Sequence, residues 1–254
     1  AYAAVSYRMA YLKTHWPAAY LCARLENHGG FHHPAVYMAE AVRLGMDIRP
    51  PHINHSQKRF TLEWENSNPV LWMGLGQVRN LRKKTITAIL QLRGEAPFSD
   101  LRDLLQRVSL QDKESANLIR CGALDGLDAN RTALLTEAEQ VSRSQNALQL
   151  PLFSQISTQA GETTIEIDQE KANWELEILG YPLTTFRAPL EANILNNPDH
   201  IPLIQLHDYA QRSVMTAGVR IPGWTGGSGF YLWDGVTWLI ARLPDQHPSP
   251  DLWK

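Results

Sequence analysis

The sequence predicts a mainly α-helical protein with a small β part, and three observations carry this prediction. Most segments before residue 190 repeat apolar residues every three or four positions, which is the spacing of one helix face. Glycine or proline closes many of these segments, as expected at helix ends. Short runs rich in Val, Trp, Tyr and Ile follow residue 60 and recur near the end of the sequence, where they favour strands.

Composition narrows the class of protein. The 254 residues suffice for one large domain or for two to three small ones. A net charge of −2 gives no overall attraction to nucleic acid, so any basic surface must be local. Cys22 and Cys121 form no CxxC pair, and we interpret them as free thiols of a cytoplasmic protein. No run of 18 apolar residues exists, so we expect no membrane association.

The first part of the chain is expected to hold three helices and then short strands. A helix over residues 1–16 carries one apolar stripe, and Pro17 suits the first turn of the next helix. A third helix, "HPAVYMAEAVRLG", is closed by Gly45. "MDIRPPHIN" is expected to be extended, and "RFTLEWE" and "PVLWM" to be strands joined by a polar turn. The apolar stripe consists of Val5, Met9, Leu12 and Trp16.

From Gly74 onward the sequence predicts short helices with tight turns. They are expected in "VRNLRKKTITAILQLR", in "DLRDLLQRV" after the capping residue Ser99, and in "KESANLIRCG" up to Gly122. "NRTALLTEAEQV" and "DQEKANWELEILGYPL" are further helices, separated by a polar tether. The last sixty residues alternate apolar and polar positions, and residues 213–243 predict about three strands.

The segment "LWMGLGQVRNLRKKTITAILQLR" is a candidate for nucleic-acid binding. Its Gly-Leu-Gly turn is expected to open a long helix whose free N–H groups favour an anion such as a DNA phosphate. This is the logic of a helix-hairpin-helix, and such contacts carry no sequence information. The alternative is a plain turn beside a solvated basic face. Residues 74–93 contain no acid and five cations: Arg79, Arg82, Lys83, Lys84 and Arg93.

A second turn of the same kind lies in "LIRCGALDGLDANRTALL", around Gly122. Taken alone, ordinary helical packing explains this segment. Two such turns about fifty residues apart would let one small domain hold both strands of a duplex.

Three other groups of residues are candidate sites, and each has a simpler structural explanation. The histidines lack the spacing of a zinc site, so turn and surface positions explain them better. The C-terminal aromatic residues could stack unpaired bases, but they are more often core residues. No pair of acids suggests a two-metal site, and the acids of the helix near residue 175 are expected on a solvated face. The histidines are His28, His32, His33, His52 and His55. The aromatic residues are Trp224, Tyr231, Trp233 and Trp238, and the acids of the helix are Glu170, Glu175 and Glu177.

Taken together, these segments resemble the alpha subunit of bacterial DNA polymerase III, the DnaE type. "AYAAVSYRMAYLKTHWPAAYLCARLEN" and "GGFHHPAVYMAEAVRLGMDIRPPHINHSQKRFTLE" resemble the end of its fingers domain. "WMGLGQVRNLRKKTITAI", "PFSDLRDLLQRV" and "LIRCGALDGLDANRTALL" resemble its tandem helix-hairpin-helix domain. "WELEILGYPLTTFRAPLE" resembles the helix that leads into its OB domain. The resemblance covers residues 1 to about 190 and is loose beyond them.

The resemblance implies a domain organisation and a set of partners. Double-stranded primer–template DNA, a sliding clamp and the remainder of the polymerase are the expected partners, with single-stranded DNA at the OB-like part. The expected domains are the C-terminal part of the fingers at 1–72, the tandem helix-hairpin-helix DNA-binding domain at 73–143, a linker with a clamp-binding peptide at 144–166, a connecting helix at 167–190 and a partial OB-like domain at 191–254. DNA contacts are expected at Gly74, Leu75, Gly76, Gln77, Arg79, Lys83, Lys84 and Gly122.

The peptide "QLPLF" places an apolar cluster inside the polar tether. Such a cluster is either a hook onto its own domain or a peptide that docks in another protein's pocket. The resemblance implies docking on the sliding clamp. Gln149 would then bond at the pocket rim, Leu152 and Phe153 would be buried anchors, and Leu150 would make a secondary contact.

The sequence lacks one part that polymerases of this type contain. The palm domain, whose aspartates hold Mg²⁺, has no counterpart, so we assign no catalytic residue, metal or cofactor and expect the chain to be inactive as a polymerase alone. Both ends are expected to be cuts through a longer protein. Two alternatives remain open: a stand-alone helix-hairpin-helix repair protein of glycosylase or nuclease type, and a structural adaptor without DNA affinity.

Overall fold

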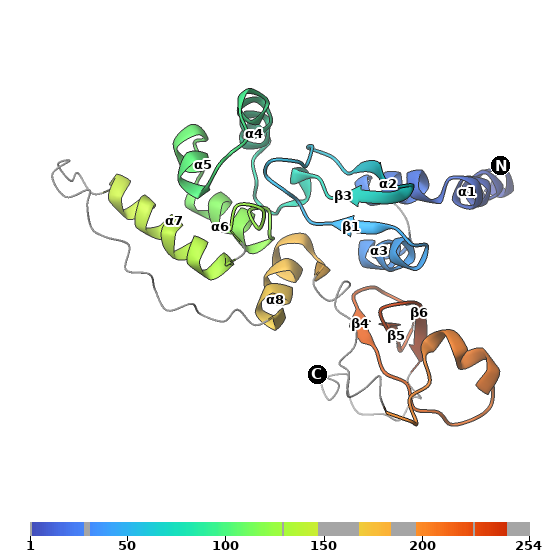
Figure 1. The fold of residues 1–254 in the computed structure, drawn as a ribbon. Helices are drawn as coiled ribbons and strands as arrows, with labels where there is room; N and C mark the ends of the chain where they lie inside the picture. Colours follow the sequence, from blue (N-terminus) through green and yellow to red (C-terminus); the bar gives the residue numbers. More distant parts are fainter. Residues whose placement is uncertain are drawn as a thin grey trace. The chain divides into compact units, whose positions relative to one another are not determined.

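The computed structural model confirms the mainly helical fold with a small β part (Figure 1). It describes residues 2–27, 31–128, 130–146, 168–183, 197–225 and 227–242. The chain divides into two compact units. The first unit comprises residues 1–48, 64–71 and 185–254, and the second comprises residues 49–63 and 72–184.

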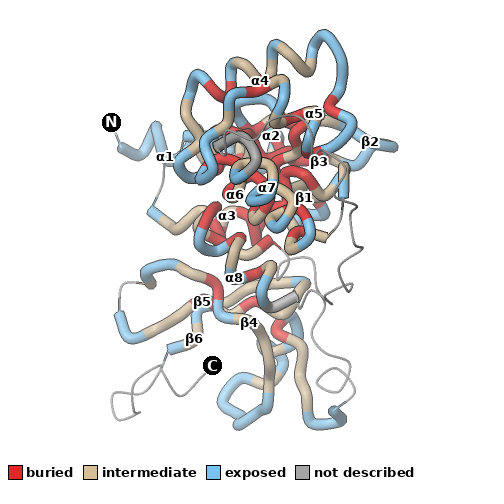
Figure 2. Tube along the Cα trace, turned by 90° about the vertical axis from the view of Figure 1, so that its left-hand side faces the viewer, coloured by how far each residue is buried: buried red, intermediate tan, exposed pale blue. Residues whose placement is uncertain are grey.

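Three helices open the first unit: α1 Tyr2–His15, α2 Pro17–Glu26 and α3 Pro34–Arg43. Pro17 and Pro34 stand in first turns, where a missing N–H costs no helical bond. Helices α2 and α3 bury apolar residues, but α1 buries none, and Figure 2 shows it largely pale blue. The apolar stripe predicted on α1 therefore faces solvent, with Val5 55% and Trp16 54% exposed.

Helix α3 ends as predicted at Gly45. This glycine has φ +80°, and the N–H of Met46 donates to the carbonyl of Ala41 at 3.0 Å. The chain then enters a three-stranded sheet of order β1-β3-β2. Its strands are β1 Asp47–Arg49, β2 Thr61–Glu65 and β3 Asn68–Trp72. Asn66 and Ser67 both have positive φ in the turn from β2 to β3, which matches the twist of a two-residue hairpin.

The C-terminal part of the first unit holds a second three-stranded sheet, of order β4-β5-β6. Its strands are β4 Val219–Ile221, β5 Gly229–Trp233 and β6 Trp238–Arg242, all antiparallel to their neighbours, and they follow the 3₁₀ helix η3 Leu203–Tyr209. Tyr231 and Trp233 are buried on β5, whereas Trp224 is 67% exposed. Three strands were expected here; their assignment to an OB fold stays a prediction.

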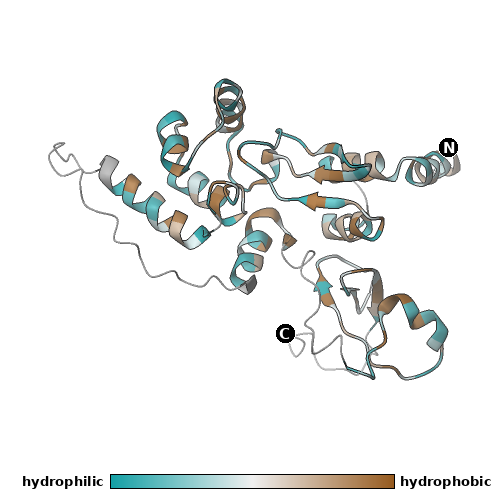
Figure 3. Ribbon diagram, in the orientation of Figure 1, coloured by the Kyte–Doolittle hydropathy of each residue, from teal (hydrophilic) through white to brown (hydrophobic). Residues whose placement is uncertain are grey.

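In its described residues, the second unit contains the short 3₁₀ helix η1 Leu75–Gln77 and five α-helices. The α-helices are α4 Lys83–Glu95, α5 Leu101–Arg107, α6 Asp112–Arg120, α7 Arg131–Asn146 and α8 Asp168–Leu179. Hydrophobic and hydrophilic bands alternate along α4 to α7, as expected of helices with one buried face (Figure 3).

Two predicted helix starts are wrong. The helix expected from Val78 begins at Lys83, because Asn80 has φ +62° and interrupts the helical backbone. Asp100, and not Ser99, is the N-cap of α5, because its carboxylate accepts the N–H of Asp103 at 2.8 Å.

Residues 49–63 pack with the helices of the second unit. The side-chain amide of Asn54 donates to the carbonyl of Phe98 and accepts its N–H, both at 2.8 Å. The N–H of Ile53 donates to the carbonyl of Ala123, also at 2.8 Å. The predicted boundary between residues 72 and 73 stays a prediction, but residues 49–63 share a compact unit with the helices that follow.

Candidate nucleic-acid interface

The second predicted turn joins α6 to α7. Gly122 follows the last residues of α6 with φ +80°, and its N–H donates to the carbonyl of Ile119 at 3.0 Å. The N–H of Ala123 donates to the carbonyl of Leu118 at the same distance, so the helix ends in a Schellman motif. A Cβ on Gly122 would collide with the side chain of Arg131. Both the backbone angle and the close contact therefore favour glycine here.

Arg131 fixes this turn from the start of α7. Its guanidinium pairs with Asp125 at 2.7 Å and with Glu175 at 3.1 Å, and it also donates to the carbonyl of Arg120. Burial alone would lower the pKa of Arg131, but the hydrogen bonds and charge of Asp125 outweigh it and raise the pKa. Glu175 is 2% exposed, so its predicted place on a solvated face is wrong. The partner on α7, 44 residues away, makes its burial possible.

The Gly-Leu-Gly turn, residues 74–76, packs tightly against residues 57–59. The N–H groups of Leu75 and Gly76 donate to the carbonyls of Gln57 and Lys58, both at 2.9 Å. The N–H of Gln77 donates to the carbonyl of Gly74 at 3.0 Å. These three donors already have partners inside the protein.

The two glycines of this turn permit the close packing. A Cβ on Gly74 would lie 2.5 Å from the backbone of Arg59, and one on Gly76 would lie 2.7 Å from the carbonyl oxygen of Lys58. From the sequence alone, these glycines were expected to form an anion-binding turn. In the structure they let two backbone segments approach each other.

The hairpin between η1 and α4 lies at residues 78–82. Its exposed residue Asn80 takes the left-handed conformation, in which asparagine is one of the few tolerated non-glycine residues. The N–H of Leu81 closes the turn on the carbonyl of Val78 at 3.2 Å. Helix α4 starts immediately afterwards, and its first N–H groups have no partner within the helix.

Glu114 joins this hairpin to α6. Its buried carboxylate accepts hydrogen bonds from the backbone N–H and the guanidinium of Arg82, at 2.9 and 2.8 Å, and from the hydroxyl of Thr85 at 2.8 Å. The N–H of Gln111 donates to its other oxygen at 3.0 Å. Burial would raise the pKa of Glu114, but the hydrogen bonds, that of Arg82 foremost, hold it at about 2. One carboxylate thus joins the first hairpin to the start of α6.

The five cations of residues 74–93 divide into two groups. Arg82 is bound to Glu114, and Arg93 donates to the carbonyls of Ile53 and Ser56 at 3.1 and 2.8 Å. The other three are exposed, and within the described part of the chain they have no ion-pair partner. These three are Arg79, Lys83 and Lys84.

Lys58 is a fourth exposed cation at this place, and it was not predicted from the sequence. Its carbonyl accepts the N–H of Gly76, and a Cβ on that glycine would lie 3.9 Å from the Lys58 side chain. Lys58 is eighteen positions before the turn that it contacts. No local pattern reveals this contact, because it depends on how residues 57–59 fold back on the turn.

Other predicted sites have structural explanations or lie outside the described residues. Gln149, Leu150, Leu152 and Phe153 of the predicted clamp-binding peptide lie outside them, as does His28. His33 caps α3, and His55 pairs with Glu63 at 3.0 Å. Within the described ranges, no group of His, Cys, Asp and Glu side chains is arranged to hold a metal ion.

Two further findings concern single predictions. Cys22 and Cys121 are both free thiols, and burial raises the pKa of Cys121 to about 12. A search of the described residues finds no helix with the length and apolar character needed to cross a membrane.

Two turns between helices, with exposed cations beside the first, are the arrangement of a helix-hairpin-helix motif. Comparison with known families agrees, because a helix-hairpin-helix motif matches residues 45–134.

The chain is homologous over most of its length to bacterial DNA polymerases of the error-prone and polymerase III alpha types. It is 29% identical to an error-prone DNA polymerase of Alkalilimnicola ehrlichii over 94% of the chain and 24% of that protein. An error-prone DNA polymerase of Pseudomonas aeruginosa is 30% identical over 75% of the chain and 19% of its own length. A DNA polymerase III subunit alpha of Campylobacter jejuni is 25% identical over 76% and 18%. The chain thus spans a quarter or less of the length of these relatives.

Proposed function

We propose that this chain is the DNA-holding part of a DnaE-type polymerase and grips the backbone of the primer–template duplex through its second unit. The exposed cation cluster of Lys58, Arg79, Lys83 and Lys84 beside the first hairpin is the observation that carries the proposal. The homology to polymerases over most of the chain favours a role in a polymerase over the alternative role as a stand-alone repair enzyme.

Phosphate groups are the chemistry that this cluster fits. Arg79, Lys83 and Lys84 supply mobile positive charges, and the first turn of α4 adds unpaired N–H groups and the positive end of the helix dipole. The N–H groups of residues 75–77 are bonded within the protein, so the contacts proposed here come from side chains and from α4. Such contacts hold a duplex regardless of its sequence.

Salt dependence tests the grip on DNA. We expect the chain to bind a fluorescent duplex in an anisotropy titration and the variant Lys83→Gln/Lys84→Gln to bind about tenfold more weakly at low salt. The slope of log K against log salt should fall in magnitude by about two for the two lost phosphate contacts. Arg8→Gln/Arg143→Gln is the matched control, because it removes the same charge from exposed positions on α1 and α7. Equal weakening in both variants would contradict a local phosphate site.

The same proposal includes docking on the sliding clamp through the peptide at residues 149–153. Its support is the sequence alone: two leucines and a phenylalanine inside a polar tether. Burial of Leu152 and Phe153 in a partner's pocket would contribute about 1.5–3 kcal/mol each before ordering costs.

Surface-immobilised bacterial clamp tests this docking. We expect the chain to bind in the micromolar range and Leu152→Ala/Phe153→Ala to lose binding, with Ser154→Ala/Gln155→Ala as the control that keeps it. If the chain does not bind, or if both variants bind equally, the peptide does not dock on the clamp. The DNA-holding role is judged separately by the anisotropy titration.

A further inference from the structure

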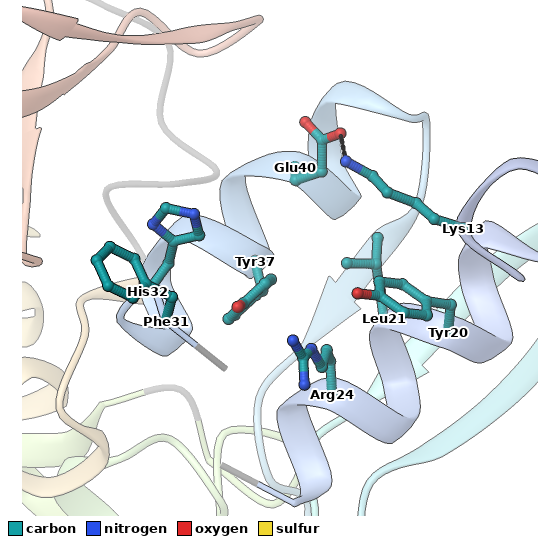
Figure 4. A pocket seen from close by; sticks show the side chains of 8 residues that line it. All are labelled: Lys13, Tyr20, Leu21, Arg24, Phe31, His32, Tyr37 and Glu40. Atoms are coloured by element: carbon teal, nitrogen blue, oxygen red, sulfur yellow. Dashed lines mark ion pairs between the residues drawn. The ribbon is translucent and has the colours of Figure 1, made fainter. Parts of the chain in front are cut away.

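A cavity of about 280 Å³ lies in the first unit between α2 and α3. Figure 4 shows Arg24 extending from α2 toward Tyr37 on α3, with Tyr20 beside it. Phe31 and His32, which precede α3, line the other end. The volume is at the lower end of the range for ligand pockets, so its occupant must be small.

Arg24 is the polar group that this cavity leaves unsatisfied. Its Nε atom is buried and has no hydrogen-bond partner in the described part of the chain. The guanidinium lies over two aromatic rings, 5.9 Å from the centroid of Tyr20 and 5.7 Å from that of Tyr37. Aromatic faces attract the cation but accept none of its in-plane donors. A planar fork of donors held in this way is suited to a two-oxygen acceptor.

Neighbouring charges leave the cavity positive. Among the described residues, Glu40 is the only acid that lines it. Its carboxylate is engaged by Arg43 at 2.7 Å, by Lys13 at 3.0 Å and by the indole N–H of Trp238 at 3.2 Å. Glu40 carries one negative charge against the three cations Lys13, Arg24 and Arg43, so the net charge of these four groups is positive. Lys13 has three donors and uses one on Glu40, so others stay available to a ligand.

The remaining wall is aromatic. The rings of Phe31 and His32 meet edge to face with centroids 5.4 Å apart, and His32 lies 6.0 Å from Tyr37. The Nδ1 atom of His32 is bonded to the hydroxyl of Tyr231 at 2.9 Å, which fixes the orientation of the imidazole. A flat ring would find face and edge contacts at this end of the cavity.

We propose that this cavity binds a small oxyanion, a phosphate or carboxylate, that is carried on a flat aromatic ring. The oxyanion bonds to Arg24, with Lys13 in support, and the ring lies against Phe31, His32 and Tyr37. Chemically the ligand is a phosphorylated or carboxylated aromatic compound of mononucleotide size or smaller. This proposal does not depend on DNA binding by the second unit.

Arginine side-chain NMR tests the proposal on the full chain. Phenyl phosphate is the first probe, and inorganic phosphate and phenol are its two halves. We expect phenyl phosphate to shift the Nε–H signal of Arg24 and to bind at least tenfold more tightly than either half. Adenosine 5′-monophosphate and benzoate, titrated in parallel, distinguish a nucleotide from a carboxylate as the source of the oxyanion.

Two variants distinguish specific binding at Arg24 from non-specific attraction of the anion to exposed cations. Arg24→Lys keeps the charge but loses the planar fork, so we expect phenyl phosphate to bind at least fivefold more weakly. Arg8→Gln, which removes an exposed cation on α1, should leave binding unchanged. The proposal is overturned if no probe binds at millimolar concentration, if phenyl phosphate and inorganic phosphate bind equally, or if Arg24→Lys binds as the unaltered chain does.

Discussion

Glu114 carries a buried charge that would be costly without the four groups that donate hydrogen bonds to it. A carboxylate removed from water loses several kcal/mol of hydration unless hydrogen bonds replace it. Arg82 supplies both backbone and guanidinium donors, and Thr85 and Gln111 supply the rest. The bonds connect the start of α4 with the start of α6, so the geometry of the first hairpin depends on this residue.

Acid should weaken the protein through Glu114. The folded chain holds its pKa at about 2, against an ordinary value of 4.5, so the unfolded chain takes up the proton first as the pH falls. The stabilisation is fully present above pH 4.5 and is lost as the pH falls from 4.5 toward 2. Urea unfolding at a series of pH values measures this loss.

The variant Glu114→Gln provides the control for this prediction. It should start with a lower free energy of unfolding at pH 7 and lose less of it between pH 4.5 and 3. Glu40, whose pKa is also held at about 2, foremost by its hydrogen bonds with Arg43, keeps part of the acid sensitivity in both proteins. Parallel pH profiles in the two proteins would contradict the assignment to Glu114.

Gly122 and Gly94 should respond oppositely to alanine. Gly122→Ala forces a side chain into a left-handed backbone and against Arg131, so we expect a loss of about 1–3 kcal/mol of unfolding free energy. Gly94 lies within α4 with open space around it, so Gly94→Ala should add about 0.4–1 kcal/mol. Thermal and urea unfolding of the two variants measure both signs. A loss in Gly94→Ala as large as in Gly122→Ala would refute the role given to the left-handed position.

Helix α1 shows the difference between a predicted and an actual core. Its apolar stripe has the spacing of a buried face, yet none of its residues is buried in this chain. Leu12 on α1 is 45% exposed, whereas Leu21 on α2 is fully buried. Periodicity identifies the face that can be buried, but it does not identify the surface that buries it.

A pair of leucine substitutions tests this distinction. We expect Leu12→Ala to change the free energy of unfolding by about 0.5 kcal/mol or less, as at other exposed positions. Leu21→Ala should cost about 2–5 kcal/mol, because it leaves a cavity in the packed interior. Chemical denaturation of the isolated chain measures both. Similar costs at the two positions would show that α1 is packed in solution.

Local sequence patterns predicted most helix ends, but the surroundings of the candidate site depend on contacts between residues that are far apart in the sequence. Gly45 and Gly122 mark helix ends as predicted, because each takes a positive φ that glycine tolerates best. The start of α4 was missed because Asn80 makes a left-handed turn inside a segment whose apolar spacing is helical. The burial of Glu175 was missed because its partner is remote in the sequence.

At the scale of the whole molecule, residues 49–63 belong to the packing of the second unit. Asn54 makes a reciprocal pair of hydrogen bonds with the backbone of Phe98, and the guanidinium of Arg93 donates to two carbonyls of this segment. The matched motif also begins at residue 45, before this segment. The folded second unit therefore needs residues that the predicted domain boundary assigns elsewhere.

Two shortened proteins test this requirement. We expect residues 45–184 to unfold in one cooperative transition and to bind duplex DNA. Residues 73–184 lack Asn54, which bonds to Phe98, and the two carbonyls of residues 49–63 that accept from Arg93. They should therefore unfold at lower denaturant and bind DNA more weakly. Circular dichroism during urea titration, with the anisotropy assay, compares them. Equal stability of the two proteins would show that residues 49–63 are dispensable.

The discontinuous division of the chain has a consequence for synthesis on the ribosome. The polypeptide passes between the two units four times, at residues 48, 63, 71 and 184. The second unit has all of its residues once position 184 has been translated, while the first still awaits β4, β5 and β6. Domains usually form in the order in which they emerge. Here the part that emerges first is completed last, so α2 and α3 wait on the nascent chain until Tyr231 and Trp238 arrive to bond with His32 and Glu40.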